Sequence, residues 1–236
     1  MSTHVPVLEL DRVLIESDPL FETSLCGLNF VLGAGELVLV LLDREHMHLP
    51  LADAASGLVT PIEGAVRFGG RDWQAMSPDE AAARRGRIGR LFAAESWVAN
   101  LDVDENITLS QRHHTRRPEE ELIDEAVTIA YDFLLPGLPL GRPSDFRRQD
   151  LQKAACIRAF LGEPALILLE RPTRDIYADI MAPLANALFS ARRRGAAVIW
   201  TTEERRVWED AGLRPTRRAL MSGARLHFCE SDEETL

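Results

Sequence analysis

Two short segments of this chain are apolar at every position, and they limit what the chain can fold into. They span residues 37–42 and 165–169, and residues 196–201 form a similar third run. Strands have this pattern when both faces of a parallel sheet are covered. We expect helices at about residues 118–134, 150–162 and 178–194. Strands that alternate with helices predict an α/β fold with right-handed crossovers.

The bulk composition limits the possible functions. With 236 residues, the chain is long enough for one sizeable core or for a core with a subdomain. Its formal net charge of −10 argues against a general nucleic-acid binder, which relies on neutralising phosphates. Cys26, Cys156 and Cys229 share no close spacing, so no disulfide framework or cysteine metal site is expected. The sequence shows no signal segment and no apolar run of roughly 18–20 residues, so we expect a soluble, cytoplasmic chain.

The spacing of residues within 143–173 is the most specific feature of the sequence. In chain order it has Pro143, then Arg147-Arg148-Gln149, a helical stretch, Glu163-Pro164, an apolar strand, and Glu170-Arg171-Pro172. This frame resembles the segment of ABC-type ATPases that joins the signature helix to the Walker B strand. The likeness extends over about residues 6–228.

The resemblance implies a fold and a division of the chain. The fold is a P-loop NTPase (RecA-like) core of the ABC ATPase type, with an N-terminal antiparallel β part and an inserted helical subdomain at about residues 93–160. Residues 1–228 are expected to form a single nucleotide-binding domain of this type. Residues 229–236 form an acidic tail, which we interpret as a solvated end.

The P-loop positions of the family have been overwritten rather than deleted. They hold Leu42, Asp43, Arg44, Glu45, His46, Met47, His48 and Leu49. A P-loop needs glycines because its backbone amides wrap the phosphates closely. Here no glycine remains, the lysine position has become His48, and the magnesium-binding hydroxyl position has become Leu49. We expect Met47, His48 and their neighbours to fill the former cleft, so that MgATP does not bind in the family's mode.

The other positions that touch nucleotide in the family are substituted as well. Arg147, Arg148 and Gln149 replace the Ser-Gly-Gly of the signature, Ala93 the Q-loop glutamine, Arg171 the Walker B glutamate and Glu203 the switch histidine. A guanidinium stays protonated, so Arg171 cannot act as a general base. Glu170 keeps a carboxylate at the magnesium-side position. Tyr177 stands near the D-loop aspartate, and Ile15 near the aromatic residue that stacks on adenine.

The resemblance therefore implies a pseudo-ATPase. We predict an ABC-type subunit without catalytic residues, cofactor or metal, which docks on the cytoplasmic face of a membrane permease and supports or regulates a transporter. A second ABC subunit is a further candidate partner, and the ATPase subunit of bacterial MCE-type phospholipid transporters is the branch that it resembles, with lipid as a candidate cargo. Two alternatives stay open: a divergent but active ATPase that uses ATP and Mg²⁺, and a soluble regulatory module derived from an ABC ATPase.

Several residues admit a second interpretation. Asp43, Glu45, His46 and His48, or the pair His113-His114, contain metal-binding side chains, but their spacing matches no tetrahedral site, and solvated loops are the favoured interpretation. Arg147 and Arg148 precede a helix and are candidates for anion binding or for plain surface charge. Glu170 and Arg171 are expected to pair with groups around the former site. Trp97 and Val98 are candidates for the permease interface or for core packing.

Overall fold

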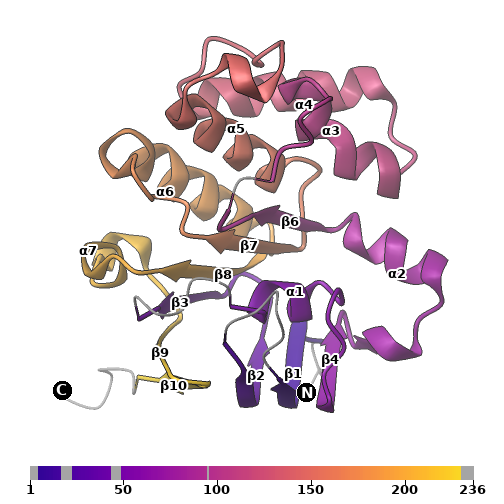
Figure 1. Ribbon diagram of the computed structural model, residues 1–236, viewed down its shortest axis with the longest axis vertical. Helices are drawn as coiled ribbons and strands as arrows, with labels where there is room; N and C mark the ends of the chain where they lie inside the picture. Colours follow the sequence, from indigo (N-terminus) through magenta and orange to yellow (C-terminus); the bar gives the residue numbers. More distant parts are fainter. Residues whose placement is uncertain (1–4, 17–22, 44–48, 95, 230–236) are drawn as a thin grey trace.

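Two β-sheets and a layer of helices build the molecule, as Figure 1 shows for the computed structural model. The structure describes residues 5–16, 23–43, 49–94 and 96–229. Its strands are β1 (Leu8–Ile15), β2 (Leu25–Leu32), β3 (Leu37–Leu41), β4 (Glu63–Phe68), β5 (Arg71–Asp72), β6 (Ile88–Leu91), β7 (Leu166–Glu170), β8 (Ala197–Thr202), β9 (Arg217–Ser222) and β10 (Arg225–Phe228). Its helices are α1 (Leu51–Ala55), α2 (Pro78–Arg85), α3 (Val103–His114), α4 (Glu119–Asp132), α5 (Arg148–Phe160), α6 (Tyr177–Arg193) and α7 (Arg205–Trp208).

The larger sheet is mostly parallel and holds all three strands that the sequence predicts. Its order is β10-β9-β3-β8-β7-β6, in which only the β9–β10 pair is antiparallel. The smaller sheet is antiparallel, with the order β2-β1-β4-β5. The three predicted helices correspond to α4, α5 and α6, with ends that differ from the expected ones by one to two residues. The predicted fold class is confirmed.

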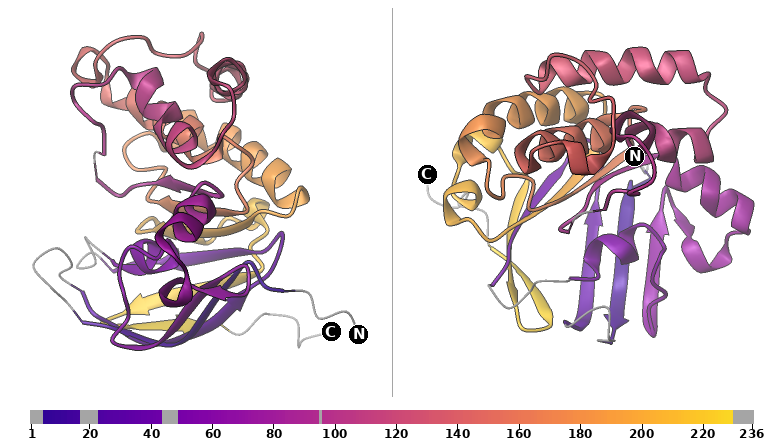
Figure 2. Two further views of the ribbon diagram at one scale, coloured as in Figure 1. Left: turned by 90° about the vertical axis from the view of Figure 1, so that its right-hand side faces the viewer. Right: turned by 45° about the horizontal axis from the view of Figure 1, so that its top comes forward.

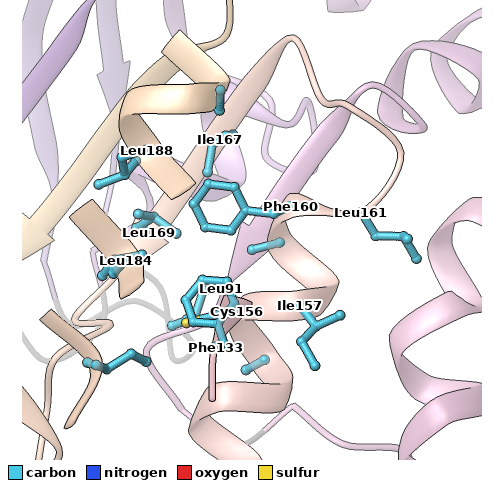
Figure 3. Close-up of a cluster of buried hydrophobic side chains, with 14 of the residues drawn as sticks. Leu91, Phe133, Cys156, Ile157, Phe160, Leu161, Ile167, Leu169, Leu184 and Leu188 are labelled. Carbon is cyan, nitrogen blue, oxygen red and sulfur yellow. The ribbon is translucent and has the colours of Figure 1, made fainter. Parts of the chain in front are cut away.

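The parallel strands alternate between two cores because successive side chains point to opposite faces of a sheet. Leu37 and Leu39 of β3 pack against helices, whereas Val38 and Val40 pack toward the antiparallel sheet and α1. Every residue of β3 and β8 is buried. Figure 3 shows the helix-side core, where Phe160 and Phe133 lie near Leu91, Leu169 and Leu184. Both faces being covered explains why these strands are apolar throughout.

Three helices, α3, α4 and α5, separate β6 from β7 in the sequence and form one end of the molecule in Figure 2. They contact one another, and α5 also packs against β6 and β7. Among the described residues, α6 is the longest helix at 17 residues, and no helix there has both the length and the hydrophobicity to cross a membrane. The division into one domain with a helical subdomain at 93–160 stays a prediction.

The approach of α5 to β6 depends on a glycine in the strand. A Cβ at Gly89 would lie 1.8 Å from the carbonyl oxygen of Ala159, which is backbone and cannot move aside. Position 89 therefore has no room for a side chain. The glycine allows the helix to pack this closely on the sheet.

We expect Gly89→Ala to lower the free energy of unfolding by about 3 kcal/mol, the upper part of the range for overpacked cores. Urea unfolding of the purified chain measures this. Gly33→Ala is the matched control, because its new Cβ meets only the flexible Glu36 side chain at 3.4 Å. Equal stability of the two variants would contradict the close packing of α5 on β6.

Candidate functional site

The carboxyl end of β7 carries Glu170 and Arg171, the residues at the Walker B positions. Glu170 is the last residue of the strand, and Arg171 follows with a φ of 52°. A positive φ is uncommon for a residue with a Cβ. The backbone is held there by the Arg171 amide, which donates to the carbonyl of Thr201 in β8 at 2.9 Å. Both residues thus lie at the carboxyl edge of the parallel strands, where ligands of open α/β sheets bind.

An arginine from the neighbouring strand pairs with Glu170. Arg90 in β6 donates from Nε to Oε1 of Glu170 at 2.7 Å and from Nη1 to Oδ1 of Asp53, in α1, at 2.6 Å. The exposed fraction of the Arg90 side chain is 10%. Short, charge-assisted hydrogen bonds in a shielded place belong to the strong kind. One guanidinium therefore joins β6, β7 and α1 and pairs with the one carboxylate that the Walker B position retains.

Burial and charge act on this ion cluster in opposite directions. Burial raises the pKa of Glu170, and it stays raised although the charge and hydrogen bond of Arg90 and a backbone hydrogen bond from Ala93 lower it. For Arg90, burial lowers the pKa, but the hydrogen bonds and charges of Asp53 and Glu170 outweigh burial, and the net pKa is raised. A guanidinium does not give up its proton in a protein. Glu170 therefore has a permanent cationic neighbour within its own chain.

The former P-loop is described only at its ends. Leu42 and Leu49 are both buried, whereas Arg44, Glu45, His46, Met47 and His48 lie outside the described residues. Leu42 and Leu49 line a cavity of about 20 Å³, which also touches Ala93, Glu170 and Arg171. Pockets for small-molecule ligands measure about 300–1,000 Å³. The cavity that these described residues line is far smaller, and the expected filling of the former cleft by Met47 and His48 stays a prediction.

The segment after β6 is held by a second arginine, Arg158 of α5. Its Nη2 donates to Oγ of Ser96 at 2.6 Å, and its Nη1 donates to the Ser96 carbonyl at 3.0 Å. The guanidinium also lies 5.2 Å from the ring centroid of Phe92 and 4.8 Å from that of Trp97. Burial, followed by the charge of Arg90, lowers the pKa of Arg158 to about 10.

Trp97 is partly buried: its ring packs against the helix-side core and lies over Arg158. A role at a permease interface stays a prediction. Its neighbour Val98 is 40% exposed. Ala93, at the Q-loop position, lies between the small cavity and the Glu170 carboxylate, to which its backbone contributes a hydrogen bond.

The signature positions stand at the amino end of α5. Arg147 is the N-cap residue, and Arg148 and Gln149 open the helix on its exposed side. Arg148 forms an ion pair with Asp175 at 3.1 Å, with both side chains more than half exposed. Exposed pairs of this kind contribute little to stability. The structure therefore shows Arg148 paired within the chain.

The remaining predicted positions are spread around this edge. Glu203 follows β8 and acts on Arg171 through its charge, which opposes the lowering of the Arg171 pKa by burial. The next residue, Glu204, accepts a hydrogen bond from Thr173 at 2.8 Å. Tyr177 opens α6, and the Arg206 guanidinium lies 3.7 Å from its ring centroid. Ile15 is buried at the end of β1, so it offers no exposed face for stacking.

Metal-binding side chains do not converge within the part of the chain that the structure describes. No three His, Cys, Asp or Glu side chains are placed there to hold an ion. His113 and His114 contact each other edge-on, with centroids 4.6 Å apart. Of the other candidate set, Asp43 is described, but Glu45, His46 and His48 lie outside the described residues.

Four contributors to the site were not predicted: Asp53, Arg90, Ser96 and Arg158. One of them does carry a signal, because Arg90 interrupts the apolar strand Ile88–Leu91, where a charged residue needs a buried partner. Nothing in the spacing identifies that partner, since Asp53 lies 37 positions away in the sequence.

Comparison with known proteins adds sequence relatives. No family model matches the chain. An uncharacterized ABC transporter ATP-binding protein of Mycobacterium tuberculosis is 30% identical over 157 residues, which cover 64% of this chain and 46% of that protein. The chain thus spans about half the length of this relative. The lipoprotein-releasing system ATP-binding protein LolD of Nitratidesulfovibrio vulgaris is 28% identical over 195 residues, covering 82% of this chain and 83% of LolD.

Solved structures agree on the architecture. The dimeric structure of MJ0796, a bacterial ABC transporter cassette, matches with a TM-score of 0.80 at 19% identity, covering 93% of this chain and 96% of that one. The ADP conformation of the cassette MJ1267 matches with a TM-score of 0.72 at 17% identity, covering 97% and 92%. The chain has the ABC ATPase cassette fold. Its sequence relatives are ATP-binding subunits of ABC transporters.

Charged groups at the carboxyl edge of the parallel sheet are paired with one another in an ion cluster. Glu170 and Asp53 share one arginine, and the adjoining cavity is small and lined largely by apolar side chains. Removing one partner from a shielded ion pair leaves an uncompensated charge, which costs more than the pair gains. The cluster therefore holds the elements together only as a complete set.

We expect Arg90→Met to lower the free energy of unfolding of the cassette by about 3–5 kcal/mol at pH 8. The loss should shrink as the pH falls. Without Arg90, burial raises the pKa of Glu170 further, so the folded state takes up a proton at a higher pH than the unfolded state. Between these two pKa values the folded state binds more protons, and stability therefore rises as the pH is lowered.

Urea unfolding between pH 8 and pH 5 measures this dependence. The matched control is Arg67→Met, which removes a more exposed pair with Glu9 at 2.8 Å and should cost about 1 kcal/mol or less. A loss for Arg90→Met that is as small as the control, or that grows as the pH falls, would contradict the description of the cluster.

Proposed function

We propose that this chain is a catalytically inactive (pseudo-ATPase) ABC-type subunit that docks on the cytoplasmic face of a membrane permease and supports or regulates a transporter. The observation that carries the proposal is the pairing of Glu170 with Arg90 at 2.7 Å. Mg²⁺ in nucleotide sites is held by one or two carboxylates together with substrate phosphates. In this chain the carboxylate at that position already faces a fixed cation.

The groups for hydrolysis are absent from the expected positions. Arg171 stands where a glutamate would activate water, and it cannot accept a proton. Glu203 stands at the switch position, where a histidine is expected. A carboxylate there adds negative charge beside the space where further negative charge would develop. These substitutions support loss of turnover independently of nucleotide binding.

Phosphate binding at the former P-loop lacks support for two physical reasons. The loop after β3 contains no glycine between residues 42 and 49, so its backbone amides cannot approach phosphates closely. Asp43 and Glu45 place negative charge in the same loop. Two unit charges 4 Å apart repel by about 4 kcal/mol at an effective dielectric of 20. These two features support a former P-loop that holds no triphosphate.

The permease partner is inferred from the relatives and from the surface. The relatives are ATP-binding subunits of transporters, and MacB of Nitrobacter winogradskyi is an ATP-binding/permease protein, 25% identical over 205 residues. Around the helices α3 and α4, Val98, Leu109, Tyr131, Leu134 and Leu140 are exposed apolar side chains. Exposed apolar side chains that gather into a patch mark contact sites for other proteins, and these residues are the candidates for such a contact.

The names of the relatives do not identify the transported substrate. The relatives are named for lipoprotein release, macrolide export and sulfate import, so their names do not agree on one substrate. A lipid cargo, and the phospholipid-transporter branch, rest on the sequence resemblance alone. They remain part of the proposal.

For the purified chain, we expect phosphate release from MgATP at the level of the protein-free background. Glu170→Gln should leave that rate unchanged, because Glu170 pairs with Arg90 and does not activate water. A coupled phosphate-release assay measures both proteins. Turnover above background that Glu170→Gln abolishes would overturn the inactive assignment and support the divergent ATPase.

Docking is tested by affinity pull-down from gently solubilised native membranes, with mass spectrometry of the captured proteins. We expect a multi-span permease, and we expect Val98→Asp to recover several-fold less of it because a charge enters an apolar contact. Leu58→Asp is the matched control, since Leu58 is 58% exposed and follows α1, away from helices α3 and α4. Recovery of soluble proteins alone would favour the regulatory module instead.

A further inference from the structure

A groove of about 630 Å³ lies next to the ion cluster, between residues 92–97, the first turns of α5 and residues 171–176. Among the residues that the structure describes, its charged lining consists of four arginines and one aspartate: Arg148, Arg158, Arg171, Arg174 and Asp175. The chain as a whole has a formal net charge of −10. The groove therefore gathers positive charge on an otherwise acidic molecule, and it is large enough for a small ligand.

The arginines of this groove are only partly neutralised. Asp175, the carboxylate among the described residues of the lining, pairs with Arg148 at 3.1 Å. Arg171 is influenced by Glu203 and Glu170. In the described part of the chain, neither Arg158 nor Arg174 forms an ion pair with a carboxylate. Nε of Arg158 is buried and has no hydrogen-bond partner there. Two cations thus lack a carboxylate partner of their own.

We propose that this groove binds a compact, multivalent oxyanion of the phosphate or pyrophosphate class. Guanidinium groups match such oxyanions because their N–H donors form planar forks that bond two oxygens at once. Positive side chains with apolar walls, here Phe92, Trp97 and Ile176, also focus the field on the ligand. A ligand with several charges suits the lining better than one with a single charge.

The groove includes Ala93, Arg148, Gln149 and Arg171, which stand at former nucleotide positions, but not the described ends of the former P-loop. Leu42 and Leu49, at the former P-loop, line the small cavity and not the groove. The cationic side chains of the groove replace the metal ion that a P-loop site needs. Binding should therefore be independent of Mg²⁺, and it does not rest on the proposed function.

The test is isothermal titration of the full chain with pyrophosphate in low-salt buffer that contains EDTA. We expect saturable binding to the wild type and weakening of about tenfold or more in Arg174→Gln, which loses charge-assisted hydrogen bonds. Added salt should weaken binding further. Arg193→Gln is the matched control, because it removes an exposed arginine at the end of α6, where it stacks on Phe189, and it should bind as the wild type does.

Thermal unfolding of both variants verifies that they are folded. A second titration, with citrate, tests the ligand class: binding of pyrophosphate supports the proposal, whereas binding of citrate alone would overturn it. Absence of saturable binding for both, or equal weakening in Arg174→Gln and Arg193→Gln, would overturn the proposal. Binding that appears only when EDTA is replaced by Mg²⁺ would also overturn it.

Discussion

The guanidinium of Arg90 is the interaction on which the carboxyl edge of the parallel sheet depends. It connects β6, β7 and α1 through two short bonds, to Glu170 and to Asp53. Burying three charges is costly, and replacing such clusters with apolar residues is often neutral or stabilising. Their effect is geometric: all three partners must remain together, because any one left alone is a shielded, uncompensated charge. The cluster therefore limits movement of Glu170 toward any external ligand.

A second guanidinium extends this constraint to the helices. Arg158 fixes Ser96 to α5, and it shares the ring of Phe92 with Arg90, at 5.2 Å and 4.4 Å from the centroid. Burial, and after it the charge of Arg90, lowers the pKa of Arg158, so the two cations also repel each other. Aromatic faces and carbonyl oxygens around them offset part of this repulsion. Ser96, in the segment between β6 and α3, is thus held by a side chain of α5.

Features that depend on neighbouring residues could be predicted from the sequence, whereas features that depend on distant residues could not. The runs at residues 37–42, 165–169 and 196–201 predicted strands correctly because burial on both faces leaves an uninterrupted apolar pattern. The ion cluster could be predicted from the sequence only in part. Glu170 was expected to find a partner near the former site, but Asp53, Arg90 and Glu170 come from distant parts of the chain, and no local pattern records which charges meet. Trp97 was ambiguous for the same reason, since its stacking partner lies in α5.

The two cores of the fold do not rely on phosphate contacts. Substitutions at the nucleotide positions of the family are therefore compatible with the fold. Helix α1 would follow the P-loop in an ATPase, and here it has only five residues, with Pro50 as an N-cap that forms no side-chain cap bond. Four of its five residues are buried against the antiparallel sheet side of the core, and the fifth, Asp53, is bound by Arg90. Apolar burial and one internal ion pair thus stabilise a helix that a bound phosphate would otherwise order. The proposed loss of nucleotide contacts is physically compatible with retention of the fold, because separate residues are responsible for each.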